Sequence, residues 1–216
     1  MTDLLSNPTV LLVWLALVAV SEAILIRDLA TKNRHLMSLM KAVWVLTVLY
    51  SGPLGLFVYV WSGRGQISAD TLLRRGFRST AHCYAGCGMG EVAGLLIAAA
   101  VLSLGTAGTA MLTFTLAYLA GFGLTVGPLV QEGVPLGRAM TDAALSETPS
   151  IAVMEAVAIG VDLTLAGGAG PGTALFWTSM AVSLSCGLLA AWPVNILLIR
   201  FGVKSGMMDP RSGASA

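Results

Sequence analysis

The chain is dominated by apolar segments that are each about as long as a membrane is thick. Hydrophobic residues make up 56% of its 216 residues and charged residues only 11%, whereas a soluble domain carries about 25% charged residues. Crossing roughly 30 Å of hydrocarbon takes about 20 residues of helix. We therefore expect an all-α, polytopic membrane bundle of about six spans. The predicted spans cover residues 8–26, 36–61, 82–104, 110–130, 149–166 and 176–199.

The connections between these segments also carry signals. Gly52-Pro53 interrupts the second segment, and proline removes a helical hydrogen bond, so we expect a kinked second span. Residues 62–80 mix leucine and phenylalanine with arginines, which predicts a short amphipathic helix on the membrane surface before the third span. Residues 131–147 are predicted to be a polar loop, with Pro149 in the first turn of the fifth span.

Basic residues provide a prediction of orientation. Clusters at residues 64–78, at Arg138 and in the tail outnumber the cluster at 27–41, and the larger set is expected inside. With six spans, both termini would then be cytoplasmic. Residues 1–7 contain no Lys or Arg, so we interpret the first segment as a retained span rather than a signal peptide. The net charge of +1 gives no reason to expect a nucleic-acid partner.

Residues 82–91, His-Cys-Tyr-Ala-Gly-Cys-Gly-Met-Gly-Glu, concentrate the chemistry of the chain. On a helix, Cys83, Cys87 and Glu91 lie on one stripe. Thiolates and thioethers select Cu(I), and thiolates with imidazole also suit zinc. We therefore expect Cys83 and Cys87 to bind a metal, Cu(I) or Zn, with His82 and Met89 as candidates to complete the ligand set.

Two other roles remain open for these cysteines. Buried cysteines often serve as small packing residues in a glycine-rich helix contact, and Cys186 in the last span is interpreted in this way. A pair of cysteines can also cycle between dithiol and disulfide, although the i,i+4 spacing of Cys83 and Cys87 is poor for a disulfide within an ideal helix.

Carboxylates inside apolar segments form the second candidate group. An ionised carboxylate there costs several kcal/mol unless it is protonated, paired or in contact with water. Glu91 lies about two turns into the third span. Glu155 and Asp162 are seven residues apart on one side of the fifth span, with Met154 beside Glu155. Together they predict a polar cavity or a route for cations or protons; the alternatives are a protonated structural acid at position 91 and an interfacial position for Asp162.

The motifs of soluble enzymes are missing from the sequence. It contains no Gly-x-Ser-x-Gly, phosphate loop, His-Glu-x-x-His or dinucleotide fingerprint on a suitable element. We therefore assign no catalytic residue and no organic cofactor.

The motif at residues 82–91 resembles the hallmark of a bacterial multi-span membrane family known only as a domain of unknown function. The family pattern is His-Cys-x-x-Gly-Cys-x-x-Gly followed by an acid, commonly Asp, where this chain has Glu91. The resemblance divides the chain into an N-terminal membrane region, 1–50, and a family-like core, 51–216. It implies a helical core in the inner membrane. Further likeness extends through Ala117-Tyr118-x-x-Gly121, Gly127-Pro128-Leu129, Met154-Glu155 and Pro193-x-Asn195-x-x-Leu198-Ile199-Arg200-x-Gly202.

The functional hypothesis is an inner-membrane protein that binds a soft metal ion, with copper first, for transport or delivery. A membrane thiol-disulfide oxidoreductase and a structural subunit of a membrane complex are the alternatives. The oligomeric state stays open between a homo-oligomer and a complex with other membrane proteins.

Overall fold

A computed structural model describes residues 2–212, and helices account for all the regular structure in this range. Five helices are long and apolar enough to cross a membrane: α2, α5 with its continuation η2, α6, α7 and α8. The all-α prediction is confirmed, whereas the count of about six spans is not. The elements are α1 (Thr2–Leu5), α2 (Pro8–Thr31), α3 (Ser38–Ser51), α4 (Pro53–Val58), η1 (Tyr59–Gly63), α5 (Leu72–Leu96), η2 (Ile97–Leu102), α6 (Thr106–Gln131), α7 (Leu136–Ala166) and α8 (Ala174–Arg200).

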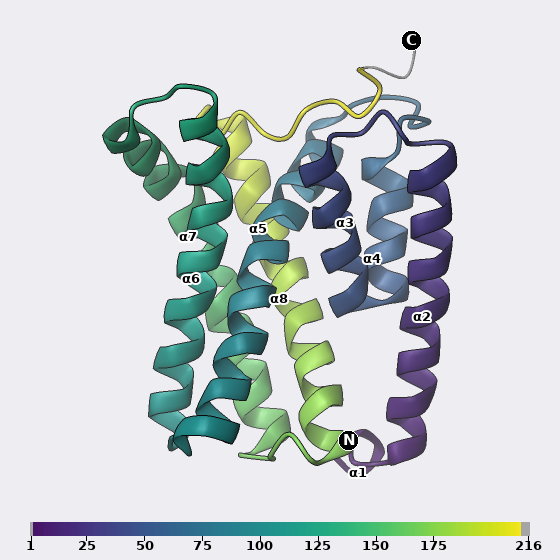
Figure 1. Cartoon of the computed structure of the whole chain (residues 1–216), viewed down its shortest axis with the longest axis vertical. Coiled ribbons are helices and arrows are strands. Elements are labelled where there is room, and N and C mark those ends of the chain that lie inside the picture. The colour runs from purple at the N-terminus through teal and green to yellow at the C-terminus, as the bar shows by residue number, and fades with distance from the viewer. Residues whose placement is uncertain (1, 213–216) are drawn as a thin grey trace.

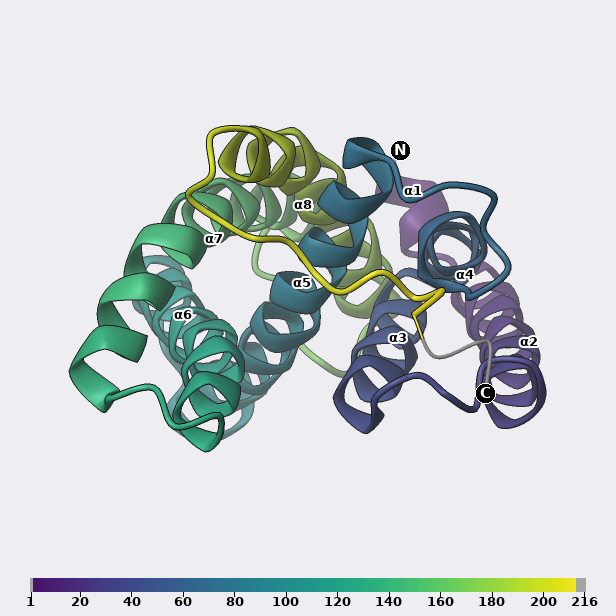
Figure 2. The ribbon, with the colours of Figure 1, turned by 90° about the horizontal axis from the view of Figure 1, so that it is seen from above.

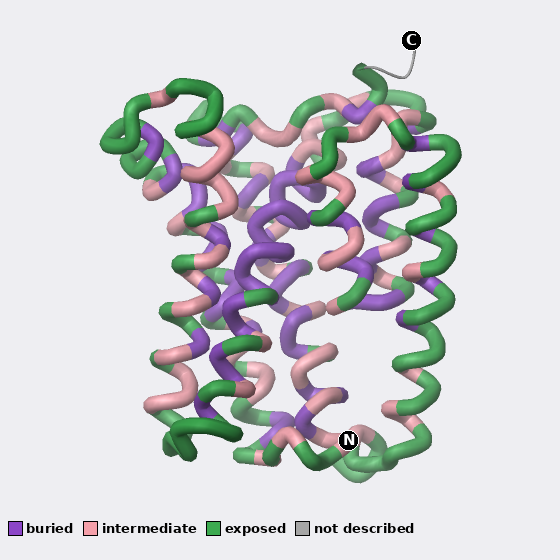
Figure 3. Tube along the Cα trace, viewed as in Figure 1, coloured by how far each residue is buried: buried purple, intermediate pink, exposed green. Residues whose placement is uncertain are grey.

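The long helices run side by side along the long axis of the molecule (Figure 1). Seen from above, α2, α3 and α4 form one group and α6 and α7 lie on the other side, with α5 and α8 between them (Figure 2). The buried residues concentrate on the middle of the bundle, including most of α5 (Figure 3). The helix that carries the cysteine motif is therefore the central one.

The second apolar segment folds as a hairpin rather than as a kinked span. α3 descends about halfway, the chain reverses at Gly52 and Pro53, and α4 with η1 returns to the same end (Figure 1). Gly52 has a φ of 54°, a conformation that favours glycine, and Pro53 starts the returning helix. Gly55 lies against the backbone of Thr47 and Val48, where an added Cβ would be 2.6 Å from a carbonyl oxygen.

Polar contacts hold the end of this hairpin close to the end of α2, where the hairpin begins. Arg64, which follows η1, forms an ion pair with Asp28 of α2 at 2.9 Å. The backbone N–H of Gly65 donates to Oδ1 of Asn33 at 2.8 Å. Because Asp28 and Asn33 flank the end of α2, the chain leaves the hairpin beside the point where it entered. The kinked-span prediction is therefore wrong at Gly52.

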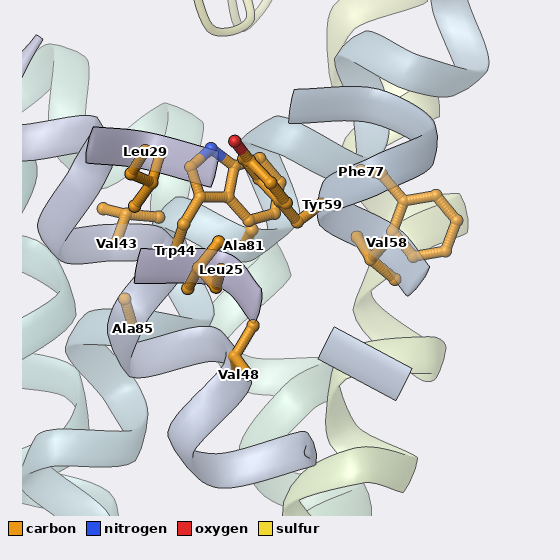
Figure 4. Packing of buried hydrophobic residues seen from close by; sticks show 10 residues of the cluster. All are labelled: Leu25, Leu29, Val43, Trp44, Val48, Val58, Tyr59, Phe77, Ala81 and Ala85. Atoms are coloured by element: carbon orange, nitrogen blue, oxygen red, sulfur yellow. The ribbon is translucent and has the colours of Figure 1, made fainter. Parts of the chain in front are cut away.

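A hydrophobic cluster fixes the hairpin against its neighbours (Figure 4). Trp44 of α3 and Tyr59 of η1 meet edge to face, with ring centroids 5.3 Å apart. Leu25 of α2 and Phe77 of α5 belong to the same buried cluster. The hairpin therefore fills the space between the first long helix and the central one.

The surface helix expected before the third span is absent between residues 62 and 80. The chain is irregular after η1, and α5 begins at Leu72 and continues unbroken past the cysteines. Arg78 explains why this segment is inside the fold: its side chain is buried and donates to Asp70 at 2.7 Å and to the carbonyl oxygen of Ser62 at 2.9 Å. The ion pair and the carbonyl contact, both made by the terminal nitrogens, offset the cost of burying this arginine.

The remaining spans agree with the sequence to different degrees. α2 begins at Pro8, and α6 and α8 lie within a few residues of their predicted bounds. α7 starts at Leu136, so most of the predicted loop at 131–147 is helical. Pro149 lies inside α7 rather than in its first turn, because the helix already begins at Leu136.

The charges are distributed asymmetrically over the two ends of the bundle. All twelve basic residues lie in loops, or within two helical turns of helix ends, at the end where α2 finishes and α5 begins. With the hairpin returning to its starting side, the N- and C-termini lie at opposite ends of the bundle (Figure 1), unlike the same-side arrangement expected for six spans. The basic residues are Arg27, Lys32, Arg34, Lys41, Arg64, Arg74, Arg75, Arg78, Arg138, Arg200, Lys204 and Arg211.

The Gly55→Ala substitution tests the hairpin. The added methyl group would collide with the backbone of Thr47 and Val48, and overpacking of this kind costs about 1–3 kcal/mol. We expect a lower midpoint of thermal unfolding in detergent. Gly160→Ala, at a helical site with nothing within 4 Å of an added Cβ, is the control and should leave the midpoint unchanged or raise it. Equal midpoints for the two variants would contradict the hairpin contact.

Candidate functional site

Glycines bring α5 into direct backbone contact with α6. A Cβ on Gly86 would lie 2.7 Å from the Cα of Gly121, and a Cβ on Gly94 would lie 2.7 Å from the Cα of Thr113. Small residues at such spacing let two helices approach closely inside a membrane protein. The close contact surrounds the middle of α5 with other helices, which is why residues 76–88 of α5 are all buried.

The two cysteines of α5 lie next to each other in this buried stretch. Cys83 and Cys87 are 1% and 0% exposed, both are free thiols, and their sulfur atoms are 3.9 Å apart. Two sulfur atoms at that separation can both lie about 2.3 Å from one ion, at an angle of about 115°. The i,i+4 spacing on a regular helix therefore produces a thiol pair with the separation of two ligands of one metal.

A chain of hydrogen bonds leads from Cys83 to the basic end of the bundle. The hydroxyl of Ser150 on α7 donates to the sulfur of Cys83 at 3.8 Å, and Nδ2 of Asn195 on α8 donates to Ser150 at 2.6 Å. Oδ1 of Asn195 accepts from Nζ of Lys204 at 3.1 Å. Lys204 also forms a buried ion pair with Glu147 at 2.7 Å. Every side chain in this series of hydrogen bonds is buried.

Two carboxylates near the thiols have unpaired oxygens. Glu155 of α7 is 0% exposed, and neither of its carboxylate oxygens has a hydrogen-bond partner among the described residues. Its carboxylate faces the thiol of Cys87. Glu91 is 2% exposed and its Oε2 is also unpaired within residues 2–212. Buried polar atoms are usually paired, so these oxygens are suited to bind a proton, a cation or a water molecule.

A cavity reaches Glu91 from the end of the bundle that lacks basic residues. It has a volume of about 450 Å³, and Glu91 and Asp162 line it together with the loops around residues 103–106 and 166–171. A second cavity, of about 500 Å³, opens at the opposite end, where His82, Glu147 and Lys204 line it. The thiol pair and Glu155 are located between these two cavities along α5 and α7.

The predicted ligand set is only partly assembled. Met89 is 41% exposed and His82 lines the second cavity, away from the thiol pair. Met154, predicted as part of the polar support, instead packs in the same buried cluster as both cysteines. Within residues 2–212, no three His, Cys, Asp or Glu side chains converge on a point where they could hold a metal ion. Of the predicted ligand set, the structure therefore brings together Cys83 and Cys87, but neither His82 nor Met89.

Sequence reasoning missed Asn195 and Lys204 as parts of the site, and for Ser150 it favoured a hydrogen bond within its own helix over one across helices. An asparagine in the last two turns of an apolar span, two residues after Pro193, is a signal that could have found Asn195, because such a side chain requires a partner. Lys204 follows the last helix and resembles an ordinary basic flank. Only the folded tail brings it to Glu147.

These features define the class of protein: a polytopic helical membrane bundle with a thiol pair in its core. The chain belongs to the family described as a domain of unknown function, DUF4396, whose model matches residues 73–204. The match begins at α5 and leaves out α2 and the hairpin. The division of the chain at residue 50 stays a prediction. No curated protein and no solved structure matches the chain.

Removal of the Lys204 amino group tests the polar chain. The Lys204→Met variant leaves Glu147, which is 1% exposed, without its cation, and breaking a buried pair in this way costs about 3–5 kcal/mol. We expect a large drop in the thermal midpoint in detergent, with part of the loss recovered in Lys204→Met/Glu147→Gln. The control is Arg138→Met, which breaks the exposed pair with Asp142 and should have an effect near zero. A wild-type midpoint for Lys204→Met would show that the pair contributes nothing.

Proposed function

We propose that the protein is a membrane carrier for a soft metal cation, and that Cu(I) is the ion it moves or delivers. The observation that supports this proposal most directly is the thiol pair of Cys83 and Cys87, with sulfur atoms 3.9 Å apart in the centre of the bundle. Thiolate and thioether ligands select Cu(I) over harder cations. Met154, packed beside the thiols, supplies the thioether.

The two cavities favour movement of the ion over a permanent structural role. One cavity leads to Glu91 from the end without basic residues, and the other leads to His82 and Glu147 from the basic end. A site between them adjoins one cavity on each side, and the cysteines themselves line neither cavity. Asp162, Glu91 and Glu155 would then offer negative charge along the path from the first cavity to the thiols.

The alternatives account for fewer of the observations. Thiol-disulfide exchange requires access of a second sulfur compound to the cysteines, and both thiols are almost completely buried. A purely structural role explains cysteines packed between glycine-rich helices. It does not explain why Glu155, at 0% exposure, keeps both carboxylate oxygens unpaired within the described part of the chain.

The distribution of basic residues supports one orientation in the inner membrane of a bacterium. Lys and Arg next to membrane spans are retained on the cytoplasmic side, and all twelve lie at the end of the bundle that holds the C-terminus. We therefore place the C-terminus in the cytoplasm. The N-terminus is placed on the opposite side, in contrast to the sequence-based expectation, because the hairpin does not cross the membrane.

Metal binding by the cysteines is tested in purified protein loaded with Cu(I) under reducing, anaerobic conditions. We expect tightly bound copper in the wild type and one copper per chain fewer in Cys83→Ser/Cys87→Ser, because serine cannot supply a thiolate ligand. Elemental analysis after desalting is the measurement. Cys186→Ser, which alters the cysteine outside the site, is the control and should retain copper. Full copper retention in the double variant would rule out the proposed site.

Orientation is tested with reporters fused to the C-terminus. A green fluorescent protein fused after the tail should fluoresce, because it folds in the cytoplasm, and an alkaline phosphatase fused at the same point should be inactive. Fusions at the N-terminus should give the reverse pattern. An active phosphatase at the C-terminus would overturn the orientation.

A further inference from the structure

The cavity at the basic end contains an unusual number of sulfur atoms. Four methionines line it, two from the start of α3 and two from the tail that follows α8: Met37, Met40, Met207 and Met208. The two pairs are about 170 residues apart in the sequence, and the folded tail brings them together as it crosses above the bundle (Figure 2). The tail is held there by its carbonyl groups, since Pro210 contacts His35 and Met207 accepts from Arg78.

Core packing accounts for Met40, which lies against the hydrophobic cluster of the hairpin, but not for Met37 and Met208. A methionine that fills a gap in a hydrophobic core is buried, as Met154 is at 1% exposure. Met37 and Met208 are 52% and 64% exposed, so burial of their side chains contributes little to stability. Their thioethers remain accessible from the cavity.

His82 adds a nitrogen donor to the same cavity. Its side chain is 3% exposed, it lines the cavity, and its Nδ1 has no hydrogen-bond partner among residues 2–212. A buried ring nitrogen without a partner is uncommon in a folded protein. Imidazole and thioethers together make a ligand set for a soft cation, and the thioethers favour Cu(I).

Charges around the cavity also favour a cation. Glu132, Asp142 and Glu147 line it, and Lys204 is the basic residue among its lining residues. Lys204 and Glu147 neutralise each other in an ion pair at 2.7 Å, and Asp142 pairs with Arg138 at 3.7 Å, so Glu132 is the lining carboxylate outside these ion pairs. Met37, Met208 and Glu132 are exposed, whereas His82 and Glu147 are buried, so the cavity offers sulfur and carboxylate groups at the surface and the imidazole further in.

We propose that this cavity is a second soft-metal site, formed by the four methionines and His82, which loads Cu(I) before it reaches Cys83 and Cys87. This inference rests on the proposed function for the role of the loaded ion, but not for binding itself. His82 and Cys83 are consecutive residues of α5. His82 lines the cavity, and Cys83 belongs to the buried cluster in the core of the bundle. An ion held by His82 would thus be bound by the residue that directly precedes Cys83.

Silver(I), a soft monovalent ion that is stable in air and does not disproportionate, is a suitable probe. Protein labelled with ¹³C at the methionine methyl groups is titrated with Ag(I) in detergent and followed by NMR. The Cys83→Ser/Cys87→Ser background removes the thiol pair, so that remaining binding belongs to the cavity. We expect the methyl signals of Met37, Met40, Met207 and Met208 to shift together as one equivalent of Ag(I) is added.

Matched variants identify the ligands. In the same background, replacing the four methionines by leucine keeps the side-chain volume and should weaken Ag(I) binding by about tenfold or more. His82→Gln should weaken it as well. Met140→Leu, an exposed methionine at the same end of the bundle that does not line the cavity, is the control and should bind as the background does. Thermal midpoints measured alongside verify that each variant is folded.

The outcomes separate this proposal from the proposed function. Unshifted methyl signals at the four positions, or equal Ag(I) affinity in the folded leucine variant and its background, would overturn the second site. Shifts at the four methionines, with undiminished Cu(I) retention when both cysteines are replaced, would support the cavity and remove the thiol site. The loading role is tested in protein that keeps both cysteines. Slower loading of the thiols with Cu(I) in the leucine variant, with the same final occupancy of the thiol pair, would support this role, and an unchanged loading rate would overturn it.

Discussion

The close approach of α5 to α6 is the constraint on which the rest of the bundle depends. Gly86, Gly94 and Gly121 leave no space for a Cβ between the two backbones, and the ring of Tyr50 from the hairpin fits against Gly88 on another side of α5. α5 is consequently enclosed by protein over the length that holds both cysteines. A larger side chain at these glycines would separate the helices and expose the thiols to lipid.

Polar groups in the core fall into two sets that behave differently. From Ser150 to Glu147 every group has a partner at hydrogen-bond distance, which is what stability requires of buried polar atoms. Glu91, Glu155 and His82 retain unpaired atoms in the described structure. Native proteins tolerate such departures where function requires them, and these three side chains lie around the thiol pair or in the cavity that adjoins it.

The sequence predicts the thiol pair correctly because i,i+4 neighbours share one helix face. It does not predict the partners, since Met154, Ser150 and Asn195 come from other helices and sequence distance says nothing of their approach. His82 and Met89 are close to the cysteines in sequence, but their side chains point in other directions, because successive residues are about 100° apart around the helix axis. The hairpin was missed for another reason. A kinked span and a reversal of the chain have the same hydropathy and the same Gly52-Pro53 sequence. Only the contacts of Arg64 with α2, and of Gly65 with the loop after α2, distinguish the reversal from the kink.

The region that matches the family model, residues 73–204, contains four crossings, α5 to α8. An even number of crossings begins and ends at the same face of the membrane. The orientation of these four helices is set by the side on which α5 starts, and a preceding segment that enters and leaves at one face does not change that side. The preceding hairpin enters and leaves at one face, so it can vary in length or disappear, and α2 alone determines on which side the N-terminus lies. The four-crossing unit is thus free to acquire different N-terminal partners while its own topology is inherited unchanged.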